Sequence, residues 1–224
     1  MLHAARCKYR TQKSRQKSPS GHHRTTVYLG SCIDIAGGSE TDICRRITCM
    51  KSLDRNIWRS SISLQTKIRL YNVYILPILL YGADTWSMTS TSSRRIDAFD
   101  QWCLRHILRI PYTAHITNDE VRRRTCQPPA TLLITTRRLR LFGHIARAGP
   151  SQDHSRALRA AISRLPVDWQ RPPGRPRRTW LRTIELDLQQ HNLGLNSAWK
   201  RAQERSKWRQ LVETAMSSQG RATR

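Results

Sequence analysis

The chain has 224 residues, enough for one large domain or two small ones. It carries 40 lysines and arginines against 15 acidic residues, a formal net charge of +25. A compact chain of this charge repels itself unless a polyanion lies nearby, so nucleic acid is the first candidate partner. The longest apolar run, residues 75–81, is too short to span a bilayer, and we see no signal peptide. We therefore expect a nuclear or cytoplasmic protein that is neither secreted nor bound to a membrane.

Residues 1–26 are basic and rich in serine, with few apolar side chains, which predicts a disordered basic tail. The composition also resembles a transit peptide, although too few apolar residues are present to form an amphipathic face. Residues 27–33, "VYLGSCI", are rich in strand-forming residues and precede two glycines, so they predict one short strand and a turn.

From Ser39 onwards the apolar residues recur at helical spacing. Ser39 with Asp42 resembles a capping box that starts the first helix. Residues 68–79 are apolar on most sides, which predicts a buried helix that Pro77 kinks or breaks. A third helix is predicted to start near Ser93 and to end before Pro111.

Further helices are predicted over 117–125, from residue 132 to about 147, and over 155–165. The stretch "RPPGRPRR" at 171–178 forbids a helix and reads as a linker. The tryptophans after it recur at helical spacing, which is more typical of core residues than of ligand platforms. The fold class is therefore mainly α: a helical bundle and a helical C-terminal region, with one short β-strand near the N-terminus.

The stretch "LLYGADTW", residues 79–86, raises the question of a polymerase active site, because such sites place aspartates after a tyrosine. Two-metal phosphoryl transfer needs several carboxylates around two ions, and Asp84 has no second carboxylate beside it. The adjacent pair Asp119 and Glu120 reads as the first turn of a helix, where acids suit the dipole. We therefore expect Asp84 to cap or end a buried apolar segment, and we expect no enzymatic activity.

Six cysteines in a chain without a secretory signal indicate reduced thiols. One alternative is a zinc-stabilised module, with a ligand set of Cys103, His106, Cys126 and His144. Structural zinc sites usually bring their ligands in two short pairs, and only the first two of these residues are closely spaced. We therefore expect no metal and no other cofactor, with Cys103 as a small apolar residue on a helix face.

Eight motifs occur in one order along the chain: "YLGSCI", "RRI", "SISLQTKIRLYNVYILPILLYGADTW", "IDAFDQWCLRHILRI", "ITNDEV", "RRLRLFGHIARA", "RPPGRPRRTW" and "WKRAQERSKWRQLV". Together, over residues 27–212, they resemble the C-terminal part of the reverse transcriptase of LINE-type (non-LTR) retrotransposons. The resemblance implies that "LLYGADTW" lies in the thumb, and that Tyr28, Leu29 and Gly30 form a primer-grip-like strand at the end of the palm. It also implies that the catalytic aspartates would lie upstream of residue 1.

The resemblance implies a division of the chain into a tail (1–26), the end of the palm (27–38), a thumb-like bundle (39–112), a post-thumb helical region (113–165), a Pro/Arg-rich linker (166–178), a C-terminal helical region (179–216) and a second tail (217–224). A thumb holds a template–primer duplex by its backbone, so the expected partner is an RNA–DNA hybrid, DNA or RNA, and no small-molecule substrate is expected. The candidate phosphate-binding arginines are Arg122, Arg123, Arg124, Arg137, Arg138, Arg140, Arg175, Arg177 and Arg178.

The triplet of Gly174, Arg175 and Pro176 has a second interpretation. It resembles the core of an AT-hook, which places an arginine in the narrow minor groove of A·T-rich DNA. The other interpretation is a basic linker that touches phosphates. For the whole chain, the alternative to a reverse-transcriptase fragment is a free-standing basic DNA- or RNA-binding module that a host has kept.

Overall fold

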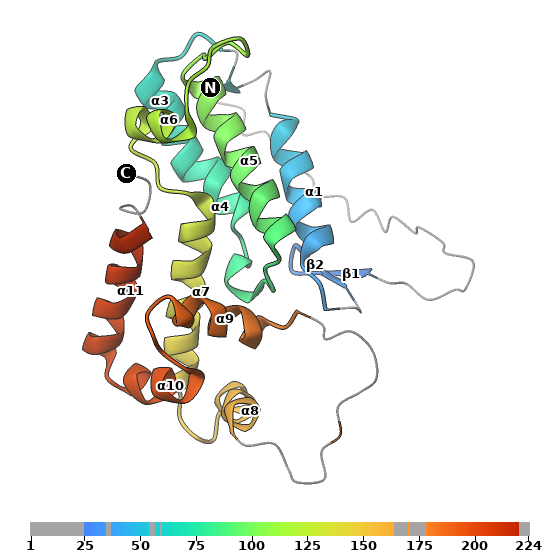
Figure 1. Ribbon diagram of the computed structural model, residues 1–224. Helices are drawn as coiled ribbons and strands as arrows, with labels where there is room; N and C mark the ends of the chain where they lie inside the picture. Colours follow the sequence, from blue (N-terminus) through green and yellow to red (C-terminus); the bar gives the residue numbers. More distant parts are fainter. Residues whose placement is uncertain are drawn as a thin grey trace, which may run out of the picture.

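The computed structural model describes residues 25–34, 37–53, 57–58, 60–163, 170 and 178–219. The fold is mainly helical, with one small antiparallel sheet near the N-terminus, which confirms the predicted fold class (Figure 1). The predicted tail over 1–26 lies outside the described residues, apart from Thr25 and Thr26, which belong to a strand. The predicted tail over 217–224 is described only as far as residue 219, which lies in the last helix.

The single predicted strand is in fact a hairpin. Strand β1, Thr25–Tyr28, pairs antiparallel with β2, Ser31–Asp34, and Leu29 with Gly30 forms the two-residue turn between them. Both turn residues have positive φ, 45° and 81°, as tight hairpin turns require. The sequence concealed the turn because leucine is an unusual residue at its first position; Gly30 was the only signal.

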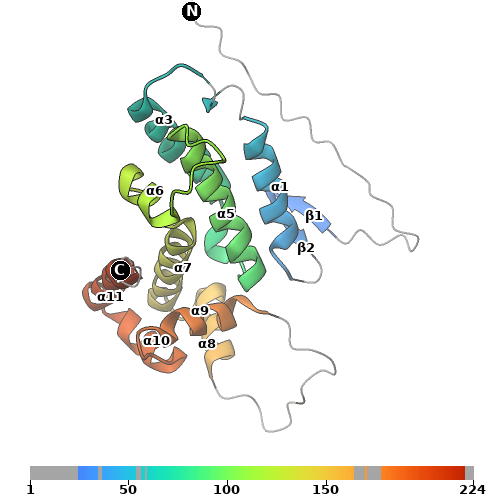
Figure 2. The ribbon, with the colours of Figure 1, turned by 45° about the horizontal axis from the view of Figure 1, so that its top comes forward.

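The first half of the chain packs as a group of helices beside the hairpin (Figures 1 and 2). Its elements are α1 (Glu40–Lys51), α3 (Leu64–Leu70), the π-helix η1 (Tyr71–Ile75), α4 (Leu76–Leu79), the 3₁₀ helix η2 (Ala83–Thr85), α5 (Ser90–Ile107) and α6 (Asn118–Thr125). The second half supplies α7 (Ala130–Arg147), α8 (Asp153–Ile162), α9 (Trp180–Gln189), α10 (Leu195–Gln203) and α11 (Arg205–Gln219).

Two hydrophobic cores share helix α7. Its first half, through Ala130 and Ile134, packs into a core with α1, η1, α4, α5 and α6. Its second half, through Leu139 and Phe142, packs into another core with α8, α9, α10 and α11. Helix α7 therefore lies at the centre of the molecule in both ribbon views and joins the two halves (Figures 1 and 2). The cores meet within α7, whereas the predicted regions divide at residues 112 and 165.

The stretch "LLYGADTW" has a structural role. Leu79, Leu80 and Ala83 are fully buried, and Gly82 takes the positive φ of 69° that turns the chain after α4. The carbonyl of Leu80 accepts a hydrogen bond from Nη1 of Arg137, 2.8 Å away, on α7. The carbonyl of Asp84 accepts one from Nε1 of Trp180, 2.7 Å away, at the start of α9. This turn therefore fixes α7 and α9 in place, and Asp84 follows the buried segment.

The predicted capping box at α1 is wrong. Ser39 precedes α1, but its side chain caps no N–H of that helix and accepts instead from the Ser87 N–H at 3.1 Å. Asp42 is only 1% exposed and accepts from the Cys32 N–H of β2 and from Nε of Arg46, both at 2.9 Å. Asp42 therefore holds the hairpin against α1. This contact is long-range, so the spacing of residues in the sequence does not reveal it.

The predicted helix over 68–79 is only half buried. Tyr71, Ile75 and Leu79 enter the core, whereas Tyr74 is 58% and Ile78 44% exposed. The π-helix η1 ends two residues before Pro77, which has no N–H to donate. The helix therefore changes its hydrogen-bond pattern near the residue where a kink was predicted. Whether each face of an apolar helix is buried depends on packing partners that are remote in sequence, so the apolar pattern alone does not predict it.

Candidate nucleic-acid interface

Three of the predicted phosphate-binding arginines are instead internal. Nη2 of Arg122 lies 2.7 Å from Oδ2 of Asp100, Nη1 of Arg137 bonds the Leu80 carbonyl, and Nε of Arg138 lies 2.7 Å from Oδ2 of Asp187. Arg138 is only 2% exposed. These guanidinium groups hold elements of the fold together; Arg138 is buried, whereas Arg122 and Arg137 are partly exposed.

Arg123 and Arg124 lie on the exposed side of α6 and share one acid, Glu120, one turn before them. Their Nε atoms lie 2.7 and 2.6 Å from its carboxylate oxygens. Hydrogen bonds from Arg123 and Arg124 lower the pKa of Glu120 from 4.5 to about 2. The Thr117 hydroxyl caps this helix by accepting from the Glu120 N–H. Half of the positive charge of the arginine pair is therefore neutralised locally.

We expect the Glu120 carboxyl to titrate near pH 2 in the wild-type chain and near its ordinary 4.5 in an Arg123→Gln, Arg124→Gln double variant. Because the folded-state pKa is the lower one, the pairing stabilises the fold above about pH 4.5 and is lost as the pH falls toward 2. Carbon-13 NMR of the glutamate carboxyl groups measures both pKa values. An unchanged pKa in the double variant would show that the two arginines do not hold this carboxylate.

The Pro/Arg-rich stretch is described only at Gln170 and from Arg178 onwards. Nε of Arg178 donates to the Met88 carbonyl at 3.0 Å, so its side chain is held against the start of α5. Arg175 and Arg177 lie outside the described residues, as does the triplet of Gly174, Arg175 and Pro176. The AT-hook interpretation therefore stays a prediction.

Tyr28, Leu29 and Gly30 form the exposed tip of the hairpin. Tyr28 is 64% and Leu29 72% exposed. The carbonyl of Gly30 accepts from the guanidinium groups of both Arg45 and Arg46. Arg46 also lies over the rings of Tyr81 and Trp86, 5.4 and 6.0 Å from their centroids. The tip is thus fixed to α1 and the "LLYGADTW" turn, and its two large side chains stay free to contact a partner.

Arg140 is the remaining predicted arginine, and the structure places it in a groove between α7 and α11. The groove has a volume of about 390 Å³, and we call it the arginine groove. It is lined by Arg140 and Arg147 of α7 and by Arg205, Trp208, Arg209, Val212 and Glu213 of α11. Four guanidinium groups face one carboxylate there, so the lining keeps an excess of positive charge.

The electrostatics of the arginine groove favour an anion. Burial, followed by the charge of Arg205, lowers the pKa of Arg147, which means that these two cations destabilise each other. Nη1 of Arg147 donates to the Ala202 carbonyl at 2.9 Å, and Nε of Arg209 to the Glu213 carboxylate at 2.8 Å. Neither Arg140 nor Arg205 has a side-chain hydrogen bond or ion pair within the described part of the chain. A phosphate between them would supply the missing acceptor.

Trp208 forms the floor of the groove but does not present its ring for stacking. The side chain is 3% exposed, and its Nε1 donates to the Leu139 carbonyl at 2.9 Å. Its ring packs against Phe142, with the centroids 5.5 Å apart. The groove therefore offers charge to a nucleic-acid backbone and no aromatic platform to a base, consistent with the prediction that this tryptophan is a core residue.

The four residues of the zinc alternative do not come together. Cys103 is fully buried in the first core, and Cys126 is exposed. The ring Nδ1 of His106 lies 2.7 Å from the Trp102 carbonyl of its own helix. Over the described ranges, no three histidine, cysteine, aspartate or glutamate side chains are placed to share a metal ion.

Over the same ranges, every helix is too short or too polar to cross a membrane.

Sequence reasoning missed Arg147, Arg205 and Arg209. Arg140 and Arg147 are seven residues apart, two turns of α7, and Arg205 and Arg209 are four apart on α11, so each pair lies on one helix face. The spacing was visible in "RRLRLFGHIARA" and "WKRAQERSKWRQLV". The packing of the two helix faces against each other was not visible in the sequence.

No protein-family model matches this chain, and no curated protein or solved structure matches it significantly.

Proposed function

We propose that this chain binds the phosphate backbone of nucleic acid through the arginine groove. We also propose that it is a fragment of a LINE-type reverse transcriptase and has no catalytic activity of its own. The observation that carries the binding proposal is the excess of arginine between α7 and α11, where two guanidinium groups have no partner in the described part of the chain. The formal charge of +25 supports it, because the whole chain attracts a polyanion. The resemblance in motif order, with a mainly helical fold after a short hairpin, supports the reverse-transcriptase origin.

The chemistry of the groove suggests which nucleic acids bind best. Guanidinium groups that contact phosphates carry little sequence information, so affinity follows charge density more than base identity. Because Trp208 is buried, single strands gain no stacking energy in this groove. We therefore expect duplexes, whether RNA–DNA hybrid or DNA, to bind more tightly than single strands of the same length.

The proposal predicts that Arg140→Gln with Arg205→Gln weakens duplex binding by about tenfold or more and lowers the salt slope by about two, one unit for each lost phosphate contact. Fluorescence anisotropy with labelled duplexes across a salt series measures both quantities. Both side chains lack hydrogen-bond partners in the described structure, so the double variant should keep the stability of the wild type.

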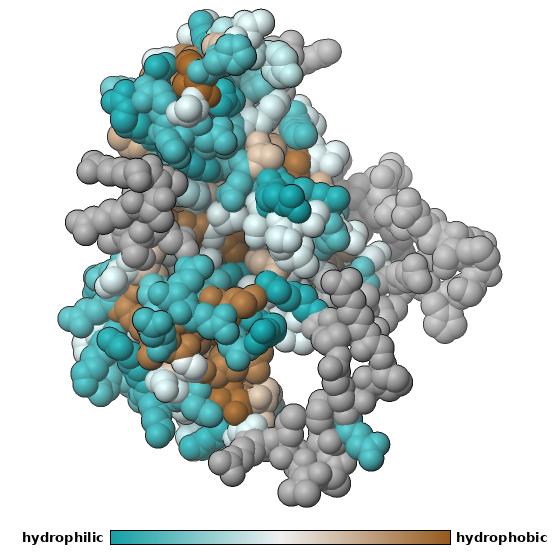
Figure 3. Space-filling view, in the orientation of Figure 1, coloured by the Kyte–Doolittle hydropathy of each residue, from teal (hydrophilic) through white to brown (hydrophobic). Residues whose placement is uncertain are grey.

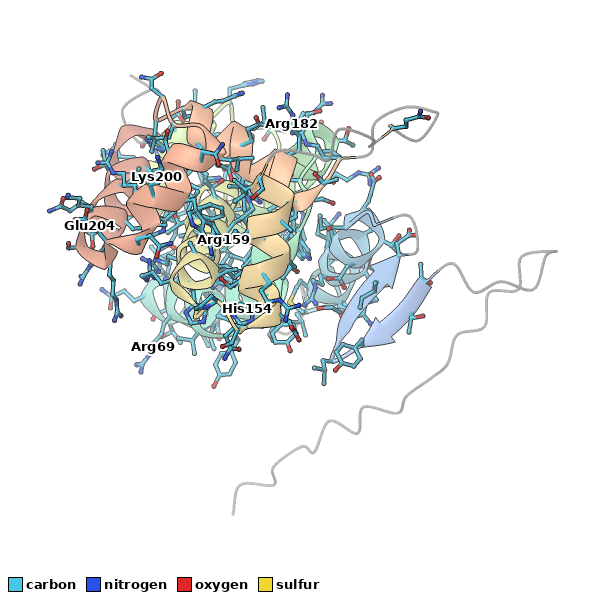
Figure 4. All side chains as sticks on the ribbon, turned by 90° about the horizontal axis from the view of Figure 1, so that it is seen from below. Arg69, His154, Arg159, Arg182, Lys200 and Glu204 are labelled. Atoms are coloured by element: carbon cyan, nitrogen blue, oxygen red, sulfur yellow. The ribbon has the colours of Figure 1, made fainter. Side chains whose placement is uncertain are left out.

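The matched control is Arg69→Gln with Arg159→Gln. These arginines are exposed on α3 and α8 (Figure 4). Neither lines the arginine groove, and their removal lowers the net charge by the same amount. We expect the control to bind within about twofold of wild type, because charges beyond a Debye length are largely screened. Equal losses in both double variants would mean that binding follows net charge alone and would remove the groove from the proposal.

A further inference from the structure

A second pocket lies where the two helical halves meet. It has a volume of about 290 Å³ and is lined by residues of α5, α7 and α9 together with Arg178. Both ribbon views show α9 crossing beside α7 near the N-terminal end of α5 (Figures 1 and 2). On the face seen in Figure 3, hydrophilic residues cover much of the surface, and hydrophobic residues gather in the lower half around α8 to α10. Most of the residues that line the pocket are polar.

Helix α7 contributes Thr131, Thr135 and Arg138, which lie on one helix face. Arg138 is 2% exposed; its Nε donates to Oδ2 of Asp187 at 2.7 Å, and its Nη2 lies 2.7 Å from the same oxygen in an ion pair. Its Nη1 is buried and has no hydrogen-bond partner within the described residues. A buried guanidinium N–H without an acceptor costs free energy, so the site would be stabilised by an acceptor that occupies the pocket.

Helix α5 points its N-terminus at the same pocket. Thr89 caps this 18-residue helix and accepts from the Ser92 N–H at 3.1 Å. The N–H groups of Ser90 and Thr91 lie in the first turn, where no carbonyl of the same helix can accept from them. Such a turn attracts anions through both its free N–H groups and the helix dipole.

The balance of charge in the pocket is positive. Two cations, Arg138 and Arg178, face a single acid, Asp187. Burial raises the pKa of Asp187, and the charges of Arg138 and Arg178 act against that rise. The hydroxyl groups of Ser90 and Ser93 add neutral donors, whereas that of Thr131 already donates to the Asp97 carboxylate at 3.0 Å. An orphan guanidinium N–H, a helix N-terminus and several hydroxyls are together the donor set that a phosphate accepts from.

We propose that this pocket binds a phosphate group, either as a free phosphate monoester or as the terminal 5′-phosphate of a nucleic-acid strand. Bound there, the phosphate bridges α5 of the first half, the shared helix α7 and α9 of the second half. It therefore stiffens the joint between the two cores. This site is separate from the arginine groove and stands whether or not the groove binds a duplex.

The test is a matched pair of variants on the first turn of α5. Ser90→Asp puts a carboxylate at the pocket, whereas Thr91→Asp puts one beside it on a residue that does not line the pocket. Both side chains are exposed, and both acids suit the helix dipole, so both variants should fold. The probes are inorganic phosphate, a 5′-phosphorylated oligonucleotide and the same oligonucleotide without its 5′-phosphate.

Thermal unfolding of the full chain is followed at constant ionic strength as chloride is replaced by phosphate. We expect phosphate to raise the melting temperature of wild type and Thr91→Asp, and to bind Ser90→Asp at least about tenfold more weakly, since like charges repel at close range. In the Arg140→Gln, Arg205→Gln background, the difference between Ser90→Asp and Thr91→Asp should remain. An equal response in Ser90→Asp and Thr91→Asp, in either background, would overturn the proposal.

The oligonucleotide arms identify the source of the phosphate. If the pocket takes a strand terminus, the 5′-phosphorylated oligonucleotide binds more tightly than its unphosphorylated twin, and Ser90→Asp abolishes that difference. If it takes a free monoester, the two oligonucleotides bind alike, and inorganic phosphate still stabilises the wild type but not Ser90→Asp. No stabilisation of the wild type by inorganic phosphate, with no preference for the 5′-phosphate, would also overturn the proposal.

Discussion

Replacing Asp100 by alanine should lower the free energy of unfolding by about 3–5 kcal/mol, because it leaves a buried charge without its partner. Asp100 is 1% exposed and lies at the centre of a polar network between four elements. Its Oδ2 accepts from Nη2 of Arg122 on α6 at 2.7 Å and from the Ala130 N–H of α7 at 3.3 Å. Its Oδ1 accepts from the hydroxyl of Tyr71 in the π-helix.

Tyr71 is the hydrogen-bond donor in its contact with Asp100. Burial, and next the Asp100 charge, raise the pKa of Tyr71 far above its ordinary value, so the phenol stays protonated and donates. Without the carboxylate, the Tyr71 hydroxyl, the Arg122 guanidinium and the Ala130 N–H all lose an acceptor. Chemical denaturation with urea measures the loss.

The control is Asp153→Ala, which removes an acid that is 95% exposed and that, within the described residues, pairs only with Arg156, one turn away. We expect that variant to stay within about 1 kcal/mol of wild type, as surface ion pairs usually do. A similarly small effect for Asp100→Ala would mean that the network is not what joins α5, α6 and α7 to the π-helix.

Gly143→Ala should cost about 2 kcal/mol of stability and weaken nucleic-acid binding at the same time. Gly143 lies inside α7, and a Cβ there would meet Nε1 of Trp208 at 2.2 Å and its Cδ1 at 2.4 Å. The indole must therefore move, which breaks its bond to the Leu139 carbonyl and its packing on Phe142. Overpacking and a lost hydrogen bond together outweigh the roughly 1 kcal/mol that alanine gains over glycine in a helix.

The loss of binding would follow from geometry, because every arginine of the groove is still present in this variant. Trp208 sits between Arg205 and Arg209 in sequence, so displacing it moves α11 and separates their side chains from those of α7. Thermal unfolding and anisotropy on the same sample measure both effects. Gly38→Ala is the control, since nothing lies within 4 Å of a Cβ at that residue. Wild-type stability in Gly143→Ala would show that α11 packs less closely than described.

Local features of the fold followed from the sequence because their causes are local. Helical spacing placed α5, α6 and α7 within a few residues of their bounds. The hairpin turn was missed because its first residue is leucine. The half-exposed face of the 68–79 helix was missed because periodicity shows which residues are apolar, and not which of them find neighbours.

The arginines show the limit of sequence reasoning most clearly. Arg138 and Arg140 are two residues apart in one arginine-rich stretch, yet one is buried against Asp187 and the other is exposed in the arginine groove. The difference arises because Asp187 lies 49 residues further along the chain, on a helix that packs against one face of α7. A count of arginines predicted a basic partner surface; only tertiary packing decides which arginines remain to form it.

The measurement that tests the central claim most directly is the salt dependence of duplex binding by the wild-type chain and the Arg140→Gln, Arg205→Gln variant. The proposed function predicts that the logarithm of the wild-type binding constant falls linearly with the logarithm of salt concentration, and that the variant loses about two units of slope. A flat wild-type response, or the same slope in both proteins, would contradict phosphate binding in the arginine groove.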